Sequence, residues 1–313
     1  MALIQNWLPP SRENWELIVW GFQFFPLVRH PPSPRAAAPF LVPLNQPADP
    51  HLAVHRRTMV HLLLPAGQDI RRVALQPARQ MGVGDDGGAG LHHAAVCQYA
   101  LPKQQGIESL PWANWTMAAL FTIHYIYRAL LAPLVLNPSM SPIHITVWAS
   151  ALIWQITNGL SLGGWLGGYG PTTVYDWAGR LYMIEVGLVI WGWGLLGNMY
   201  HDDDLREIRR GAGRRQKKEA EKTRKPVQSV DKVYMLPKNG LFHFILYPHY
   251  LCEWVEWTGF WMIGGWGCVP ARSFVLNEIA TMLPRAVQGR KWYVEKFGKD
   301  KVGNRKAVIP GLL

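Results

Sequence analysis

The chain has 313 residues, of which 49% are hydrophobic and 16 are Trp, and its mean hydropathy is -0.02. A mean near zero is typical of soluble proteins, but here it averages long apolar runs with strongly basic connecting segments. About 20 apolar residues in a helix span the hydrocarbon core of a bilayer. The apolar runs therefore predict an all-α, multi-pass transmembrane helical bundle. The three cysteines show no metal-ligand spacing, which argues against a metal site and against a disulfide framework.

The formal net charge of +11 is concentrated in two segments, residues 205–225 and 285–306. Both adjoin membrane-length apolar runs, and basic loops beside such runs face the cytoplasm under the positive-inside rule. A basic patch can also bind nucleic acid. The adjoining apolar runs favour membrane lipid as the partner and predict no nucleic-acid partner.

The N-terminal segment, residues 1–28, has no basic n-region and no small-residue cleavage site, so we do not interpret it as a secretory signal. Its apolar run is short for a membrane span and stops at Arg29, which suggests a truncated first helix. Residues 29–100 differ in composition, because Pro is frequent and no Trp occurs between Trp20 and Trp112. We expect this second segment to be anomalous or disordered and to lack packed structure, although so long a structureless insert is unusual in a compact domain.

Residues 101–313 have the composition of a membrane domain. Its apolar runs lie at 111–136, 144–169, 177–199, 239–269 and 273–283. We expect about four or five crossings after residue 110, with a weak one near the start of the chain.

Ionisable side chains at membrane depth are costly and mark candidate functional sites. Tyr125 and Arg128 are three residues apart and share a helix face. A Tyr hydroxyl can donate a hydrogen bond to a ketone, and Arg can bind a phosphate or carboxylate. An aromatic belt with a snorkelling Arg gives the same pattern, and position alone does not separate the two interpretations.

Two further stripes of polar residues follow along the chain. The first is Asn198, Asp202, Arg206 and Arg209, which suits a nucleotide ribose and its phosphates. Its spacing alone is also typical of an ordinary solvated helix face. The second stripe contains His249, Glu253 and Glu256 in otherwise apolar sequence, and no further His or Cys spacing supports a zinc site there. By themselves, Arg285 and Tyr293 belong to a basic interfacial tail.

Several motifs occur in an order that resembles a known family. They are His-Tyr-x-x-Arg at 124–128, the Asn198 stripe, YMLPKNGLF at 234–242, PHYLCEWVEW at 248–257, and the ending RKWYVEKF…RKAVIPGLL. Over residues 111–313 the chain resembles the steroid 5α-reductase (3-oxo-5-alpha-steroid 4-dehydrogenase) family. No G-x-G-x-x-G fingerprint occurs, so the resemblance implies a cofactor held inside the helical bundle.

The resemblance implies a bundle of about seven membrane-spanning helices that encloses NADPH and an apolar lipid or steroid substrate. A helix can span a bilayer because it satisfies its own backbone hydrogen bonds. It also implies an endoplasmic-reticulum enzyme that transfers hydride to the β-carbon of an enone, while Tyr125 stabilises charge on the ketone oxygen. The residues implied to line the cofactor are Arg128, Asn198, Asp202, Arg206, Arg209, Tyr234, His249, Glu253, Arg285 and Tyr293.

The chain departs from the family at three points. Gly289 stands where many members carry His. His249 stands where the steroid-specific branch often has Asn, and its Pro-His-Tyr context is similar to the polyprenol-reductase branch. The family also places a carboxylate beside the catalytic Tyr, in a Trp-x-x-Met-Glu-x-Pro type motif on the second helix, and no such motif precedes Tyr125 here.

A shift of reading frame suggests one origin for the missing motif. Read one nucleotide out of frame, with synonymous codons allowed, residues 83–99 can give Trp-Ala-Thr-Met-Glu-Ala-Pro followed by an apolar run. We hypothesise that much of 29–100 is a frame-shifted or mis-spliced translation. The second helix and its Glu would then be lost, and the activity impaired.

Other functions share parts of this pattern. A trans-2-enoyl-thioester reductase or a polyprenol reductase of the same superfamily would use the same hydride chemistry. A membrane methyltransferase would bind S-adenosylmethionine, and a non-enzymatic scaffold would bind neither. Because S-adenosylmethionine has no phosphate, the arginines at 128, 206 and 209 favour a dinucleotide.

Overall fold

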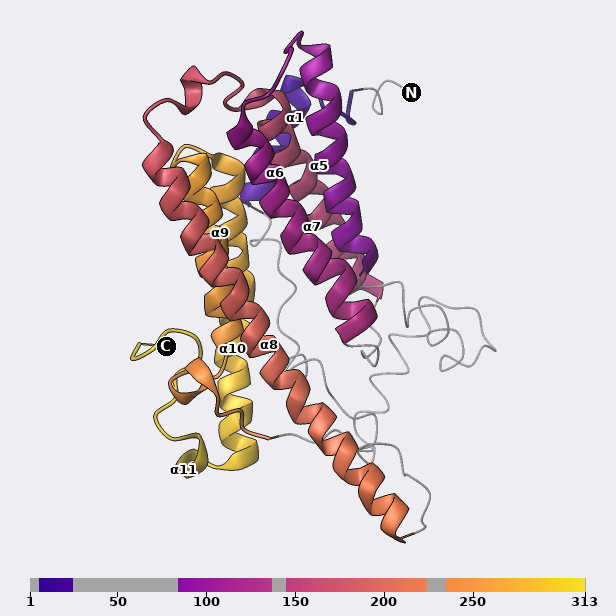
Figure 1. Ribbon diagram of the computed structural model, residues 1–313, viewed down its shortest axis with the longest axis vertical. Helices are drawn as coiled ribbons and strands as arrows, with labels where there is room; N and C mark the ends of the chain where they lie inside the picture. The colour runs from indigo at the N-terminus through magenta and orange to yellow at the C-terminus, as the bar shows by residue number, and fades with distance from the viewer. Residues whose placement is uncertain (1–5, 25–83, 137–144, 224–234, 313) are drawn as a thin grey trace, which may run out of the picture.

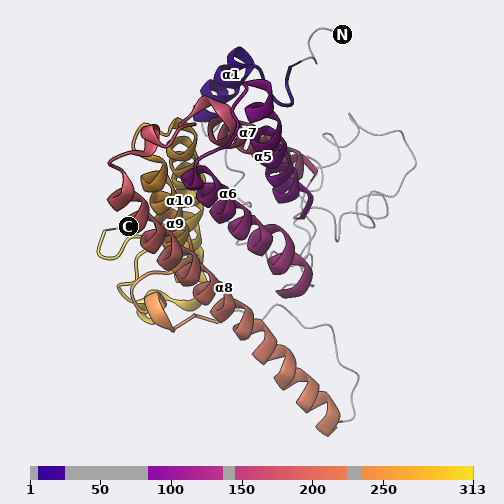
Figure 2. The ribbon, with the colours of Figure 1, turned by 45° about the horizontal axis from the view of Figure 1, so that its top comes forward.

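The computed structural model describes residues 6–24, 84–136, 145–223 and 235–312, and among these residues every regular element is a helix. In chain order the helices are α1 (Arg12–Gln23), α5 (Gly84–Gln104), α6 (Trp112–Tyr125), the π-helix η2 (Ile126–Leu136), α7 (Ile145–Gly164), the π-helix η3 (Trp165–Tyr169), the 3-10 helix η4 (Tyr175–Trp177), α8 (Leu181–Thr223), the 3-10 helix η5 (Gly240–His243), α9 (Pro248–Gly264), α10 (Val269–Phe297) and α11 (Lys299–Val302). The long helices lie side by side, and the C-terminal part of α8 projects beyond the bundle (Figure 1). Figure 2 shows the same projection from another direction.

The expected apolar runs correspond to helices, with changed boundaries. The helix at 112–136 and α8 are each long and apolar enough to cross a membrane. The run expected at 177–199 continues to Thr223, because the basic residues that follow are good helix formers. The run expected at 239–269 is not one helix, since η5 and a loop precede α9.

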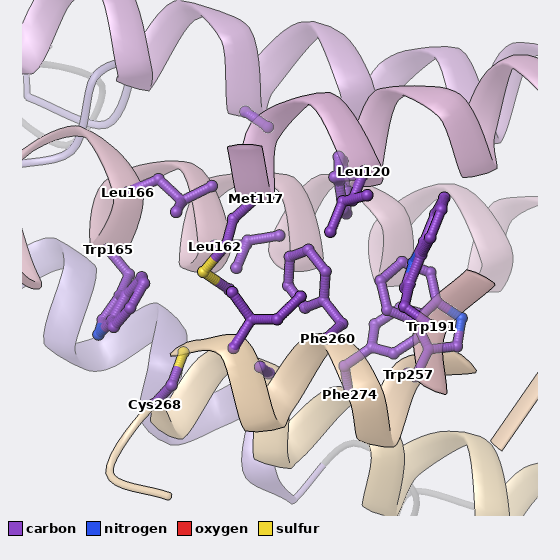
Figure 3. Packing of buried hydrophobic residues seen from close by; sticks show 14 of the residues in the cluster. Met117, Leu120, Leu162, Trp165, Leu166, Trp191, Trp257, Phe260, Cys268 and Phe274 are labelled. Atoms are coloured by element: carbon purple, nitrogen blue, oxygen red, sulfur yellow. The ribbon is translucent and has the colours of Figure 1, made fainter. Parts of the chain in front are cut away.

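Aromatic rings build much of the core between the helices. The Trp257 ring centroid lies 4.1 Å from that of Phe274 and 5.3 Å from that of Phe260. Figure 3 shows these rings beside Met117 and Leu162, which come from α6 and α7. One cluster thus joins α6, α7, α9 and α10 around the region where Tyr125 lies.

Helices α8 and α9 touch backbone to backbone. A Cβ added at Gly194 would lie 2.3 Å from the Glu256 nitrogen, and one at Gly259 would lie 2.5 Å from the Trp191 nitrogen. Only glycine allows so close an approach, as in many helix pairs of membrane proteins. The contact brings the polar stripe of α8 within hydrogen-bonding distance of α9.

The expectation that residues 29–100 lack packed structure is wrong for 84–100. These residues form most of α5, which packs along α7. The helix tolerates its many small residues because glycines of both helices meet. A Cβ at Gly159 would lie 2.2 Å from the Gly90 carbonyl oxygen, and one at Gly163 would lie 2.6 Å from the Ala94 Cα. A helix therefore occupies the place of the expected lost second helix, whereas residues 29–83 lie outside the described residues.

The N-terminal helix α1 has 12 residues. Ser11 caps α1 by accepting a hydrogen bond from the Asn14 nitrogen at 3.4 Å. Trp15 Nε1 donates to the Ser161 carbonyl oxygen at 2.8 Å, and Phe22 is buried. The helix is therefore anchored against α7, while residues 25–28 of the predicted segment lie outside the described part.

Candidate active site

Tyr125 is the last residue of α6, where the chain widens into the π-helix η2. Its side chain is 3% exposed, and Asn158 Nδ2 donates a hydrogen bond to its hydroxyl oxygen at 3.2 Å. Gln155 also lies beside this hydroxyl. Among the described residues, the Oε1 atom of Gln155 has no hydrogen-bond partner. Because Asn158 is the donor, the phenolic proton stays available for another acceptor.

Arg128 lies in the first turn of η2 and faces α8 and α9. Its guanidinium contacts the carboxylates of Asp202 at 3.2 Å and Glu253 at 3.4 Å. The side chain is 35% exposed, so it is not fully enclosed by these partners. The π-helix η2 begins at the residue after Tyr125, and π-helical turns occur often at functional sites.

The stripe on α8 faces α9 and η2, although its spacing alone is also typical of a solvated helix face. Asn198 Nδ2 donates to Glu253 Oε2 at 3.0 Å and to the His249 carbonyl oxygen at 3.1 Å. Arg206 is almost wholly buried, donates to the Tyr127 hydroxyl at 2.6 Å and lies 3.7 Å from Asp202. The structure therefore gathers three of the four stripe residues, and the side chain of Arg209 lies outside what it describes.

Two polar atoms near this cluster lack hydrogen-bond partners among the described residues. They are Asn198 Oδ1 and His249 Nδ1, both inaccessible to solvent. Unsatisfied buried polar atoms are costly and call for an explanation. A polar ligand that enters between η2, α8 and α9 would supply one.

The C-terminal candidates lie around the start of α9. The Tyr293 ring lies 6.3 Å from that of Tyr247, which in turn lies 5.7 Å from that of His249. Arg285 is close enough to Tyr250 to interact with it electrostatically. These side chains border the cluster of Arg128, and Tyr234 lies outside the described residues.

The structure also explains Gly289. A Cβ at this position would lie 1.7 Å from the Tyr247 hydroxyl oxygen. The Tyr247 ring thus fills the space that a larger side chain would need. This departure from the family pattern is therefore coupled to a neighbouring aromatic residue.

Sequence reasoning assigned no role to three polar residues of the site. Asn158 holds the Tyr125 hydroxyl, His124 pairs with Glu256 at 2.7 Å, and Glu278 is a buried acid on α10. Each of the three is a polar residue in an apolar run of the sequence, and this pattern could have indicated a functional residue. Among the described residues no group of His, Cys, Asp and Glu is placed to hold a metal ion.

A family model described as 3-oxo-5-alpha-steroid 4-dehydrogenase matches residues 141–313. The chain belongs to this family. The resemblance inferred from the motifs is thereby confirmed, and the family name supports an oxidoreductase of steroid metabolism.

Three relatives are similar to this chain, and two of them carry steroid-reductase names. An uncharacterised protein of Schizosaccharomyces pombe is 38% identical over 197 residues, covering 63% of this chain and 67% of the relative. The steroid 5-alpha-reductase DET2 of Solanum lycopersicum is 32% identical over 61% of this chain and 66% of its own length. The 3-oxo-5-alpha-steroid 4-dehydrogenase 1 of Rattus norvegicus is 29% identical over 69% of this chain and 73% of its own length. This chain thus spans about two thirds of the length of the first two relatives.

Proposed function

We propose that this protein is an NADPH-dependent reductase of a carbon–carbon double bond conjugated to a ketone, acting on a 3-oxo-4-ene steroid. The observation that carries the proposal is the Tyr125 hydroxyl, which is buried, held by Asn158 and surrounded by aromatic rings. An apolar ring system with one ketone oxygen fits such surroundings. The steroid names of the two characterised relatives favour this substrate over an enoyl thioester or a polyprenal.

The residues around Arg128 suit a nicotinamide dinucleotide. Arg128 offers a partly exposed guanidinium for a phosphate, and the partnerless atoms of Asn198 and His249 offer an acceptor and a ring nitrogen. NADPH supplies a hydride equivalent when bound. Tyr125 and Arg128 lie one helical turn apart, so ketone and cofactor would meet between α6, α8 and α9.

Tyr125 has a defined part in this reaction. When the β-carbon of an enone gains a hydride, negative charge develops on the ketone oxygen. A preorganised O–H donor stabilises that charge, and burial strengthens its effect. Asn158 already holds the phenolic oxygen by a hydrogen bond, so the Tyr125 hydroxyl need not reorient when charge develops on the ketone oxygen. The α-carbon then takes a proton, which completes the saturated ketone.

We further propose that the chain is a multi-pass protein of the endoplasmic reticulum membrane. Large apolar side chains are exposed along the outer faces of several helices, where lipid would cover them. They include Ile123, Leu130, Leu134, Ile153, Val189, Trp193, Leu196 and Leu276. The exposed basic part of α8 beyond residue 205 would lie in the cytoplasm.

The described side chains of α5 give Tyr125 no carboxyl partner. Residues 87–104 of α5 contain no Asp or Glu, so this part of the second helix offers no acid to the tyrosine. Without a partner, a neutral phenol is a modest stabiliser of developing charge. Turnover through Tyr125 should then be low unless another carboxyl group serves.

The direct test is a product assay. Purified protein in detergent would receive NADPH and a 4-ene-3-ketosteroid, and in parallel an enoyl thioester or a polyprenal. We expect the 5α-reduced steroid as the main product. NADPH-dependent reduction of the thioester or the polyprenal alone would contradict the steroid assignment.

A further inference from the structure

A pocket of about 360 Å³ lies between the end of η5 and the C-terminal segment of the chain. It is formed by residues 243–244, 301–306 and 310–311. Among the described residues, none that we propose to bind the cofactor or the substrate lines it. Helix α11, which contributes to the pocket, packs against α10 and lies beside its C-terminal end (Figure 1). The pocket is therefore separate from the site of Tyr125 and Arg128.

Backbone hydrogen bonds join the segments that form this pocket. The Lys306 nitrogen donates to the Phe244 carbonyl oxygen at 2.9 Å, and the Leu246 nitrogen donates to the Lys306 carbonyl oxygen at 2.9 Å. The Arg305 guanidinium adds a hydrogen bond to the Pro237 carbonyl oxygen at 3.0 Å. The pocket is thus held in shape by the fold itself, and Arg305 is part of its wall.

The pocket is positively charged. Lys301, Arg305 and Lys306 line it, and no Asp or Glu does so among the described residues. Within the same part of the chain, Lys301 and Lys306 form no ion pair with a carboxylate. A concave surface lined by charges of one sign concentrates counter-ions, and lysine ammonium groups bind phosphate. The pocket therefore suits a phosphate group.

The surroundings favour a lipid head group over a dissolved anion. Phe244 lines the pocket and is 61% exposed, and its ring lies 6.5 Å from that of His243. Amphipathic and aromatic rings at a membrane surface lie at the level of the head groups. Residues 285–306 are also a basic segment that we expect to face the cytoplasm beside the membrane. An exposed ring beside unpaired ammonium groups fits the boundary between head groups and acyl chains.

We propose that this pocket binds the phosphate head group of an anionic phospholipid, with Lys301 and Lys306 as its charged contacts and Phe244 beside the acyl chains. The bound lipid holds the C-terminal segment against the membrane surface. This inference rests on the proposed membrane location, and it needs neither the cofactor nor the steroid.

The test uses the full chain purified in a non-ionic detergent. Dioctanoyl phosphatidic acid, dioctanoyl phosphatidylcholine and inorganic phosphate are titrated separately, and native mass spectrometry measures the bound fraction. The variant is Lys301→Gln/Lys306→Gln. The matched control is Lys218→Gln/Lys222→Gln, which removes the same charge from exposed positions on the projecting part of α8. NADPH affinity is measured on the same preparations.

We expect phosphatidic acid to bind the unchanged protein more tightly than phosphatidylcholine or inorganic phosphate does. Each lysine near a lipid phosphate contributes about fivefold in affinity, so Lys301→Gln/Lys306→Gln should bind phosphatidic acid about 25-fold more weakly. The control variant should keep the affinity of the unchanged protein, and neither variant should change NADPH affinity.

Several outcomes would overturn the inference. Equal weakening in both double variants would show that net charge alone attracts the lipid. Inorganic phosphate or phosphatidylcholine bound as tightly as phosphatidic acid would exclude an anionic lipid site. A loss of NADPH affinity in Lys301→Gln/Lys306→Gln would assign the pocket to the cofactor.

The inference and the proposed reaction fail separately. An unchanged protein that binds phosphatidic acid at this pocket but does not bind NADPH contradicts the proposed reductase and leaves the lipid site standing. If the double variant does not fold, Lys301→Gln and Lys306→Gln are compared singly with Lys218→Gln. Each should then weaken phosphatidic acid binding about fivefold, and unchanged binding in both would overturn the inference.

Discussion

The imidazole Nδ1 of His124 and the Oε1 of Glu256 lie 2.7 Å apart, and the two side chains are only 4% and 0% exposed. This pair joins α6 to α9. It lies directly beside Tyr125, which follows His124 in the chain, and the His124 ring also lies 4.6 Å from the Trp257 ring. Removing one partner of a buried hydrogen-bonded pair leaves the other unsatisfied, which costs about 1–3 kcal/mol. The pair therefore fixes the position of the helix end that carries Tyr125.

Glu256→Ala should strongly destabilise the protein, because it leaves the buried His124 without its partner. We expect a clear fall in the thermal unfolding temperature in detergent, and a smaller one for Glu256→Gln, which retains an acceptor oxygen. Glu185→Gln is the control, as Glu185 is exposed on α8. Equal unfolding temperatures for Glu256→Ala and the control would show that the pair contributes nothing to stability.

Gly289→Ala should also be destabilising, because the new methyl group would meet the Tyr247 hydroxyl. Overpacking of this kind costs about 1–3 kcal/mol. The double variant Gly289→Ala/Tyr247→Leu should lose less than the sum of the single changes, since the smaller side chain makes room. Gly213→Ala, with no atom within 4 Å of the added Cβ, serves as control. Additive losses would refute the coupling between the two positions.

The preference for NADPH over NADH should depend on Arg209 more than on Arg206. Arg206 already bonds Tyr127 and lies against Asp202, so its guanidinium is committed within the protein. Arg206→Ala should weaken both cofactors alike, whereas Arg209→Ala should reduce selectivity by about 10-fold, the effect of losing one charge-assisted contact of roughly 1.4 kcal/mol. Binding titrations with both cofactors measure this. Unchanged selectivity in Arg209→Ala would remove this residue from the 2′-phosphate site.

Gly163→Leu should separate α5 from α7, because the side chain would enter the Ala94 backbone. We expect limited proteolysis in detergent to cut within α5 much faster in this variant, while cleavage within α8 stays slow. Gly192→Leu is the control, since an added Cβ there meets nothing within 4 Å. Resistance of α5 in Gly163→Leu would contradict the packing described here.

The sequence was most informative where a helix alternates long apolar runs with single polar residues. The stripe from Asn198 to Arg206 follows directly from helical spacing, and its neighbours on α9 could be guessed from the motif order. Contacts between helices could not be predicted in this way. Neither the link between Asn158 and Tyr125 nor that between His124 and Glu256 has any local signature, because the partners lie far apart in the chain.

Helix α5 escaped prediction for another reason. Its glycines have low helix propensity and its sequence shows little amphipathic pattern, so residues 84–100 do not resemble a helix by themselves. The helix is held by close contact with the glycines of α7, which no single-segment argument includes. Whether residues 83–99 arose by a shift of reading frame stays a hypothesis, and sequencing the transcript across codons 25–105 tests it.

In the proposed reaction the Tyr125 hydroxyl stabilises charge on the ketone oxygen of the substrate. This role is tested most directly by the kcat for reduction of a 4-ene-3-ketosteroid by Tyr125→Phe, with NADPH affinity measured on the same preparation. Tyr99→Phe is the control, because Tyr99 is exposed on α5. We predict that Tyr125→Phe binds NADPH normally and loses about 10²–10³-fold in kcat, whereas Tyr99→Phe changes neither quantity. A Tyr125→Phe variant with full kcat would contradict the account.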